Sequence, residues 1–111
     1  MAFDIDYLHL AKEYGGPVGC KQWVYDTADA TGTVDGVDYF AGVAAPTLTS
    51  KGMEVGDMVL VRIWTTAVPV TTAEKNSENP ADAAWHIVRA IDADGNATLA
   101  AETAIVVAAG A

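Results

Sequence analysis

The chain has 111 residues, of which fifteen are acidic and six are basic, and its formal net charge is −9. This length corresponds to one domain, and the charge excludes proteins that use clustered Lys and Arg to neutralise a phosphate backbone or an anionic lipid surface. Hydrophobic residues make up 51% of the chain, which is more than the thin core of so small a domain can bury, so we expect part of the apolar surface to contact a partner.

The sequence contains no pattern typical of export or membrane insertion. No apolar run approaches the roughly 20 residues that a membrane span requires. The first six residues lack the positive flank and the apolar stretch of a signal peptide. We therefore expect synthesis in the host cytoplasm without export. Cys20 is the single cysteine, which excludes a disulfide within the chain.

Residues 1–20 are expected to form an arm in front of a single β-rich domain at residues 21–111. Helical spacing connects four residues of this arm, and the Gly-Gly-Pro sequence at residues 15–17 ends whatever precedes it. The four residues are Tyr7, Leu10, Ala11 and Tyr14. We predict an extended, loosely held arm that contains one helical turn.

Two elements are predicted in the next part of the chain. Residues 21–26 are dense in aromatic and β-branched side chains, which is typical of a strand, with Trp23 and Tyr25 on one face. In residues 35–45 the apolar side chains recur at helical spacing, and Pro46 prevents continuation. This second pattern predicts one short helix, and it is carried by Val37, Phe40, Val43 and Ala44.

The alternation in residues 58–66 predicts the clearest strand of the sequence. One face carries Val59, Val61 and Ile63, and the other carries Met58, Leu60, Arg62 and Trp64. Both faces are largely apolar. The strand should therefore lie in the middle of a sandwich or have its second face covered by another chain.

The last part of the chain contains one long polar loop and further strands. Residues 71–82 are charged and aperiodic and should form an exposed loop. Residues 85–91 predict a strand, and residues 92–96 predict a hairpin turn because Asp-Gly supplies positive φ angles. Two short strands, or one bent strand, follow at residues 98–100 and 104–108. Together the elements predict an all-β fold, mainly an antiparallel sandwich or a small barrel, with one short helix and the extended N-terminal arm.

Patterns for catalysis and metal binding are missing. A Ser, Cys or Thr nucleophile needs a base beside it, and the two histidines are His9, in the arm, and His86, inside a strand. Together with Cys20 they lack the spacing of a zinc site. We therefore predict no catalytic residue, no cofactor and no metal site.

Two arginines and three tryptophans indicate contacts with a partner. Arg62 and Arg89 each lie within an apolar strand, where the guanidinium must reach a carboxylate, a carbonyl or water. Extension along a sheet edge and an ion pair across an interface both fit that pattern. The three tryptophans are typical of core or interface anchors in a small β domain, and they are Trp23, Trp64 and Trp85.

Five short motifs give the sequence a resemblance to a known family. In chain order they are Met1-Ala2-Phe3-Asp4, Trp23-Val24-Tyr25-Asp26-Thr27 with Asp29, Thr33-Val34, Asp38-Tyr39-Phe40 and Val55-Gly56-Asp57-Met58-Val59. This order resembles that of small virion proteins of tailed phages, known as head decoration, head-fibre or spike-base proteins, including those of gene transfer agents. The resemblance covers residues 1–66. Asp38 stands where a glycine is expected, and residues 71–108 extend beyond the pattern.

The resemblance implies a structural subunit without enzymatic activity on the exterior of the capsid. Its partners would be copies of itself, as a homotrimer or alternatively a pentamer, the major capsid protein, and a fibre protein mounted on top. Nucleic acid and membranes are not expected partners. The arm would clamp onto the capsid. The expected interface residues are Phe3, Ile5, Tyr7, Leu8, Trp23, Tyr39, Phe40, Arg62, Trp64 and Arg89.

Two other classes of protein are also compatible with the sequence. A small β-sandwich that binds glycans would use the three tryptophans and the loop at residues 71–82. A small enzyme would need a polar cleft with perturbed carboxylates, and no spacing in the sequence indicates one.

Overall fold

The computed structural model describes residues 3–14, 19–44, 51–65, 68–69, 72–75, 79–101 and 103–105. Its elements are, in chain order, the 3-10 turn η1 (Ile5–Tyr7), β1 (Leu8–Tyr14), β2 (Cys20–Thr27), the one-turn helix α1 (Thr31–Val34), β3 (Met58–Trp64), the 3-10 turn η2 (Thr72–Glu74), β4 (Pro80–Ile91), β5 (Ala97–Leu99) and β6 (Thr103–Ile105). Strands dominate, so the predicted all-β class is confirmed.

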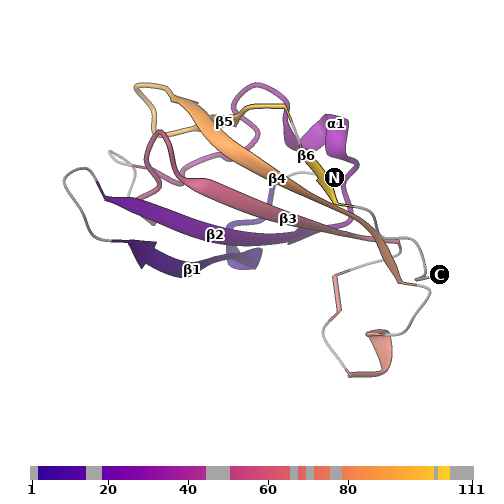
Figure 1. The fold of residues 1–111 in the computed structure, drawn as a ribbon. Helices are drawn as coiled ribbons and strands as arrows, with labels where there is room; N and C mark the ends of the chain where they lie inside the picture. Colours follow the sequence, from indigo (N-terminus) through magenta and orange to yellow (C-terminus); the bar gives the residue numbers. More distant parts are fainter. Residues whose placement is uncertain are drawn as a thin grey trace.

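The strands form one connected, twisted sheet (Figure 1). Its order is β1-β2-β3-β4-β5, and β6 also pairs with β4. Because β6 pairs with residues of β4 that already pair with β3, it lies on the opposite edge of β4. Antiparallel pairing, which was predicted for most of the sheet, joins β1 to β2, β3 to β4, and β4 to both β5 and β6. In contrast, β2 and β3 run parallel.

The parallel pair explains where the core lies. Two neighbouring parallel strands cannot be joined by a tight turn, so the chain must cross one face of the sheet between them. The described parts of residues 28–57, which include α1, belong to this crossover (Figure 1). Its completely buried side chains join the sheet residues in the core, and they are Val34, Phe40, Val43 and Met53. The core therefore lies between the crossover and one face of the sheet.

The predicted alternation of β3 is confirmed. Val59, Val61 and Ile63 are buried, whereas Met58, Leu60 and Trp64 are half-buried and Arg62 is exposed. In β2, Trp23 lies beside Val59 and Tyr25 lies beside Val61. Burial of a large apolar side chain contributes about 1.5–3 kcal/mol, so the face of the sheet that carries them is a main source of stability.

The short helix predicted for residues 35–45 is wrong. The described part of this segment forms turns, and the single helical turn, α1, precedes it. Asp38 has a φ angle of 58° and Gly42 has a φ angle of 71°, and left-handed residues interrupt a right-handed helix. Val37, which carried the helical spacing, is 80% exposed. The segment is a loop that buries Phe40, Val43 and Ala44 but leaves Val37 in solvent.

The segment predicted as a loose arm is part of the sheet. β1 pairs with β2 in antiparallel register, and Leu8 is completely buried opposite Tyr25. A domain boundary at residue 20 would separate two paired strands. Leu10, which contributed to the predicted helical spacing, is 47% exposed on β1. The helical turn expected from that spacing is wrong, because residues Leu8–Tyr14 form a strand. The 3-10 turn η1 lies in front of it, and there the Asp4 side chain accepts a hydrogen bond from the backbone N–H of Asp6.

The hairpin predicted at residues 92–96 is confirmed. The backbone N–H of Asp92 donates to the carbonyl of Asn96 at 3.0 Å, and the N–H of Gly95, whose φ angle is 82°, donates back to Asp92 at 3.1 Å. β4 already begins at Pro80, so the end of the predicted loop belongs to the sheet. The last two predicted strands correspond to β5 and β6, and residues 106–108 lie outside the described residues.

Candidate functional site

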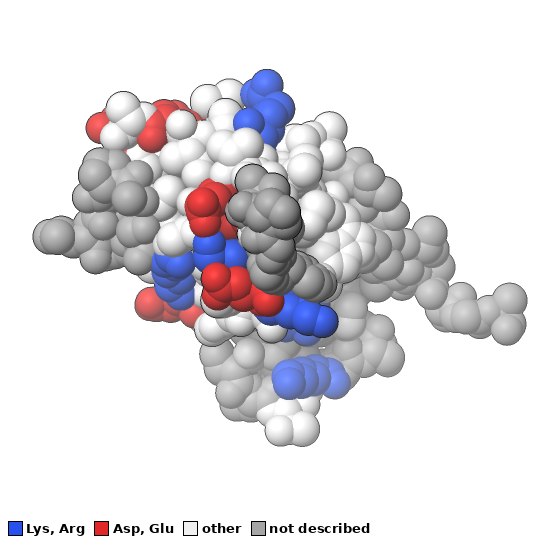
Figure 2. Space-filling view, turned by 60° about the vertical axis from the view of Figure 1, so that its left-hand side comes forward, with Lys and Arg blue, Asp and Glu red and all other residues white. Residues whose placement is uncertain are grey.

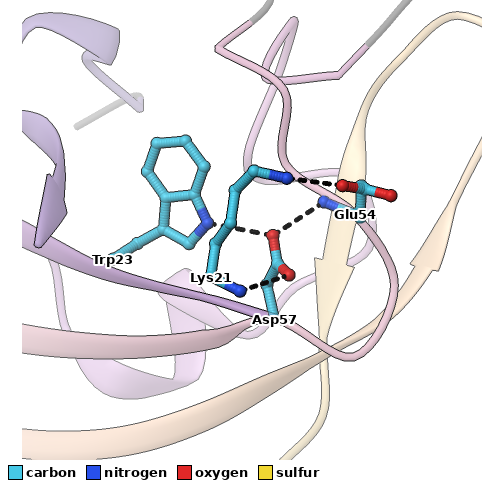
Figure 3. A network of polar contacts seen from close by, with 4 residues as sticks. All are labelled: Lys21, Trp23, Glu54 and Asp57. Carbon is cyan, nitrogen blue, oxygen red and sulfur yellow. Dashed lines mark hydrogen bonds and ion pairs between the residues drawn. The ribbon is translucent and has the colours of Figure 1, made fainter. Parts of the chain in front are cut away.

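The turn before β3 is held by the buried carboxylate of Asp57 (Figure 3). Asp57 Oδ2 accepts hydrogen bonds from the Trp23 indole N–H at 3.0 Å and the backbone N–H of Glu54 at 2.9 Å, and Oδ1 accepts from the backbone N–H of Lys21 at 3.1 Å. The turn closes through the N–H of Asp57 and the carbonyl of Glu54, and Gly56 has a φ angle of 94°. The Val-Gly-Asp motif of the sequence is therefore a structural clamp that ties β2 to β3.

Charges around this clamp are mixed in sign. Lys21 forms an ion pair with Glu54, whose carboxylate raises the pKa of Lys21 above its ordinary value. Figure 2 shows basic and acidic side chains interleaved at this end of the sheet. An exposed pair of this kind contributes little to stability. The end of the sheet with the Val-Gly-Asp turn therefore presents no single-sign patch in this view.

An aromatic cluster packs the N-terminus onto the crossover. Phe3, Tyr25, Tyr39 and Phe40 lie with ring centroids 4.9–6.1 Å apart. The Tyr39 hydroxyl donates to Asp29 Oδ2 at 2.5 Å and lies 3.1 Å from the Tyr25 hydroxyl. Burial, reinforced by the bond to Asp29, raises the pKa of Tyr39 well above its ordinary value. This arrangement is structural, since its aromatic groups mainly face one another.

The structure divides the ten expected interface residues into three groups. Leu8, Trp23 and Phe40 are no more than 1% exposed, so their assignment to an interface is wrong: they fill the core of their own chain. A second group is partly buried against that core, and it consists of Phe3, Ile5, Tyr7 and Tyr39. The third group lies at the surface, and it consists of Arg62, Trp64 and Arg89. Large apolar residues are typical of cores and interfaces alike, which is why the sequence did not separate these groups.

The sheet face opposite the crossover carries apolar side chains that no core residue covers. We call it the open face and define it by Val24, Met58, Leu60, Trp85 and Ile87. Register aligns His9, Val24, Leu60 and Trp85 across β1 to β4. All five side chains are at least partly exposed, Ile87 by 45%, and none belongs to the core cluster or packs against it.

A pocket of about 300 Å³ opens beyond the open face, where β3 ends and β4 begins. Its lining residues are Asp26, Arg62, Trp64, Val68, Pro69, Lys75 and Pro80. Asp26 accepts hydrogen bonds from Arg62 Nε at 2.7 Å, from Arg62 Nη2 at 2.8 Å and from the Trp64 indole N–H at 3.0 Å. The carboxylate that binds Arg62 is therefore that of Asp26 in the same chain. The Arg62 guanidinium also lies 5.8 Å from the Trp64 ring centroid.

The two histidines lie in different environments. His86 is 2% exposed on the core face of β4, where its Nδ1 lies 2.8 Å from the carbonyl oxygen of Ala100 and its Nε2 has no partner among the described residues. His9 is exposed on β1. The described residues contain no group of three or more His, Cys, Asp or Glu side chains arranged to hold a metal ion. Within the same residues, no helix has the length and hydrophobicity needed to cross a bilayer.

Sequence reasoning missed several residues of these two surfaces. It identified the outer side of β3 and named Trp85 as a core or interface anchor, but it did not place Val24 and Ile87 beside them, because the partner strands were unknown. Asp26 lies beside Arg62 only because β2 and β3 are parallel with these two residues in register. The two apolar faces of β3 were the signal that an outer surface existed.

Comparisons with known proteins give no relative for this chain. No protein-family model matches it, and no match was found among the curated proteins or the solved structures. The resemblance to small phage virion proteins therefore stays a prediction from the sequence motifs.

Proposed function

We propose that the protein is a structural subunit of a tailed-phage head, a decoration, head-fibre or spike-base protein that forms an oligomer and attaches to the outside of the major capsid lattice. The observation that carries this proposal is the open face: one side of the sheet has a core, and the other carries the exposed Ile87 and the half-buried Met58, Leu60 and Trp85, none of which packs against that core. β-Sheets commonly bury such a second face against another sheet about 10 Å away. Here that second layer would come from another subunit.

The open face covers only part of the area that a stable contact needs. Three strands about 4.8 Å apart, each contributing about three residues at 3.4 Å, give a patch of roughly 150 Å². A stable interface needs about 800 Å² per partner. The open face would therefore form the centre of a contact whose polar rim includes exposed neighbours such as Arg89 and His9.

Charge and chemistry favour the same class of function. A net charge of −9 keeps a protein with an exposed apolar face soluble and attracts a positively charged partner surface. Many weak contacts repeated over a lattice give strong attachment through avidity. The described polar clusters around Asp57 and Tyr39 maintain the fold, which suits a subunit whose role is structural.

The proposal is tested by placing a charge on the open face, at its most exposed residue. Ile87→Lys should prevent co-sedimentation of the protein with empty phage heads and should lower its native mass, because a buried lysine would lack a partner. Val37→Lys is the matched control, since Val37 is 80% exposed on a loop of the crossover. Circular dichroism should show that both variants are folded. Unchanged head binding and mass in Ile87→Lys would contradict the proposal.

A further inference from the structure

The pocket at the end of β3 adjoins the open face on the same side of the sheet, because Arg62 and Trp64 follow Met58 and Leu60 on that side of β3, but it differs from the open face in chemistry. Three of its seven lining residues are charged, namely Asp26, Arg62 and Lys75, and the other four are Trp64, Val68, Pro69 and Pro80. We propose that this pocket binds a carboxylate-bearing sugar ring, such as a uronic acid unit of a glycan. This ligand-binding activity goes beyond the structural role proposed above and does not depend on it.

The polar groups of the pocket favour an anion. Asp26 is occupied as an acceptor by Arg62 and Trp64, and its side chain is only 11% exposed. The Arg62 side chain is 50% exposed and uses Nε and one Nη2 hydrogen, so Nη1 can donate to a ligand. Lys75 is exposed, and its ammonium has no ion-pair partner among the described residues. The pocket thus carries one net positive charge in a chain whose total is −9.

The apolar walls and the volume favour a single ring. A cavity of about 300 Å³ is at the lower end of the range for small-molecule sites. The C–H surface of a sugar can lie against Trp64 and the two prolines, while its hydroxyls reach the polar side. The Trp64 indole is already oriented by its bond to Asp26, so little order must be gained on binding.

Two other kinds of ligand fit less well. An extended peptide binds most readily by adding a strand to a free sheet edge, but Arg62 belongs to β3, where it is paired with β2 on one side and with β4 on the other. A polyanion would be repelled by the net charge of the whole chain. A single carboxylate gains the local attraction of Arg62 and Lys75 with little of that repulsion.

The test uses glucuronic acid as the probe and nuclear magnetic resonance of the full chain as the assay. Glucuronic acid should shift the indole N–H signal of Trp64 in a saturable way and leave that of the buried Trp23 unchanged, whereas glucose should shift neither. Lys75→Gln should weaken binding about fivefold, as expected for one exposed charge-assisted hydrogen bond. Arg89→Gln is the matched control, because Arg89 is an exposed cation of β4 that does not line the pocket.

The outcomes separate this inference from its alternatives. The inference is overturned if glucuronic acid gives no saturable shift of the Trp64 signal, or if glucose gives an equal shift. It is also overturned if N-acetylglutamate amide binds equally well, because that result would indicate a site for acidic peptide side chains. An equal loss of binding in Arg89→Gln would also overturn it, since the effect would then come from overall charge. Lys75 lies outside the open face, so Lys75→Gln should keep the native mass of the wild type, and failure of the assembly proposal would leave this test intact.

Discussion

Replacing Asp57 with alanine should destabilise the protein strongly, because one carboxylate accepts hydrogen bonds from two donors of β2 and one donor of the turn before β3. In Asp57→Ala the indole N–H of Trp23, a residue 1% exposed, loses its acceptor inside the core, which costs about 1–3 kcal/mol. The backbone N–H groups of Lys21 and Glu54 also lose a charged acceptor, at about 0.5–1.5 kcal/mol each. The expected total is about 2–6 kcal/mol, a large part of the 5–15 kcal/mol typical of a domain.

Urea denaturation followed by tryptophan fluorescence measures this loss as a change in the free energy of unfolding. Asp94→Ala is the matched control, because it removes the same charge from an exposed position and should change stability by no more than about 0.5 kcal/mol. If both variants unfold at the same urea concentration, the clamp contributes no more than a surface charge, and the reasoning from its three hydrogen bonds is refuted.

Three further predictions concern the rest of the fold. Leu8→Ala should lower the free energy of unfolding, measured by urea denaturation, by about 2–5 kcal/mol because it leaves a cavity. Leu10→Ala on the same strand should lower it much less, since the Leu10 side chain is 47% exposed. Equal losses would mean that β1 is a loose arm. The pKa of Tyr39 is raised above its ordinary value of 10.0, so the unfolded chain releases the hydroxyl proton at a lower pH than the folded chain. The free energy of unfolding should therefore fall as pH rises above about 10. Tyr39→Phe should flatten this dependence, and an unchanged slope would contradict the assignment. Gly56→Ala should destabilise by about 1–2 kcal/mol because its φ angle is 94°, whereas Gly32→Ala, in α1 with open space at its Cβ position, should be neutral or stabilising; thermal unfolding of both variants decides this.

Local patterns predicted the parts of the fold that depend on local physics. The alternation of β3 and the Asp-Gly hairpin between β4 and β5 follow from side-chain periodicity and from backbone sterics, so both were visible in the sequence. The pairing of β1 with β2 and the parallel neighbourhood of β2 and β3 depend on contacts between distant residues. Helical spacing near residue 40 misled because a loop with left-handed Asp38 can bury Phe40 as a helix would.

The candidate surfaces show the same division. Arg62 and Trp64 were identified from the sequence because a cation and an indole on one side of an apolar strand need a particular environment. Their partner Asp26 was not identified, since it precedes them by more than thirty residues and meets them only through the parallel register. Trp23 was assigned to an interface because an aromatic side chain is equally typical of a core, and only the position of the crossover decided between the two.

The most direct test of the assembly proposal is the native mass of the wild-type protein by sedimentation equilibrium over a range of micromolar concentrations. If sister copies cover the open face, the mass should be a closed multiple of the 11.5 kDa of one chain, three or five times that value. A stable species of 11.5 kDa at every concentration, with Trp85 accessible to a fluorescence quencher, would contradict the claim that copies of the chain cover the open face.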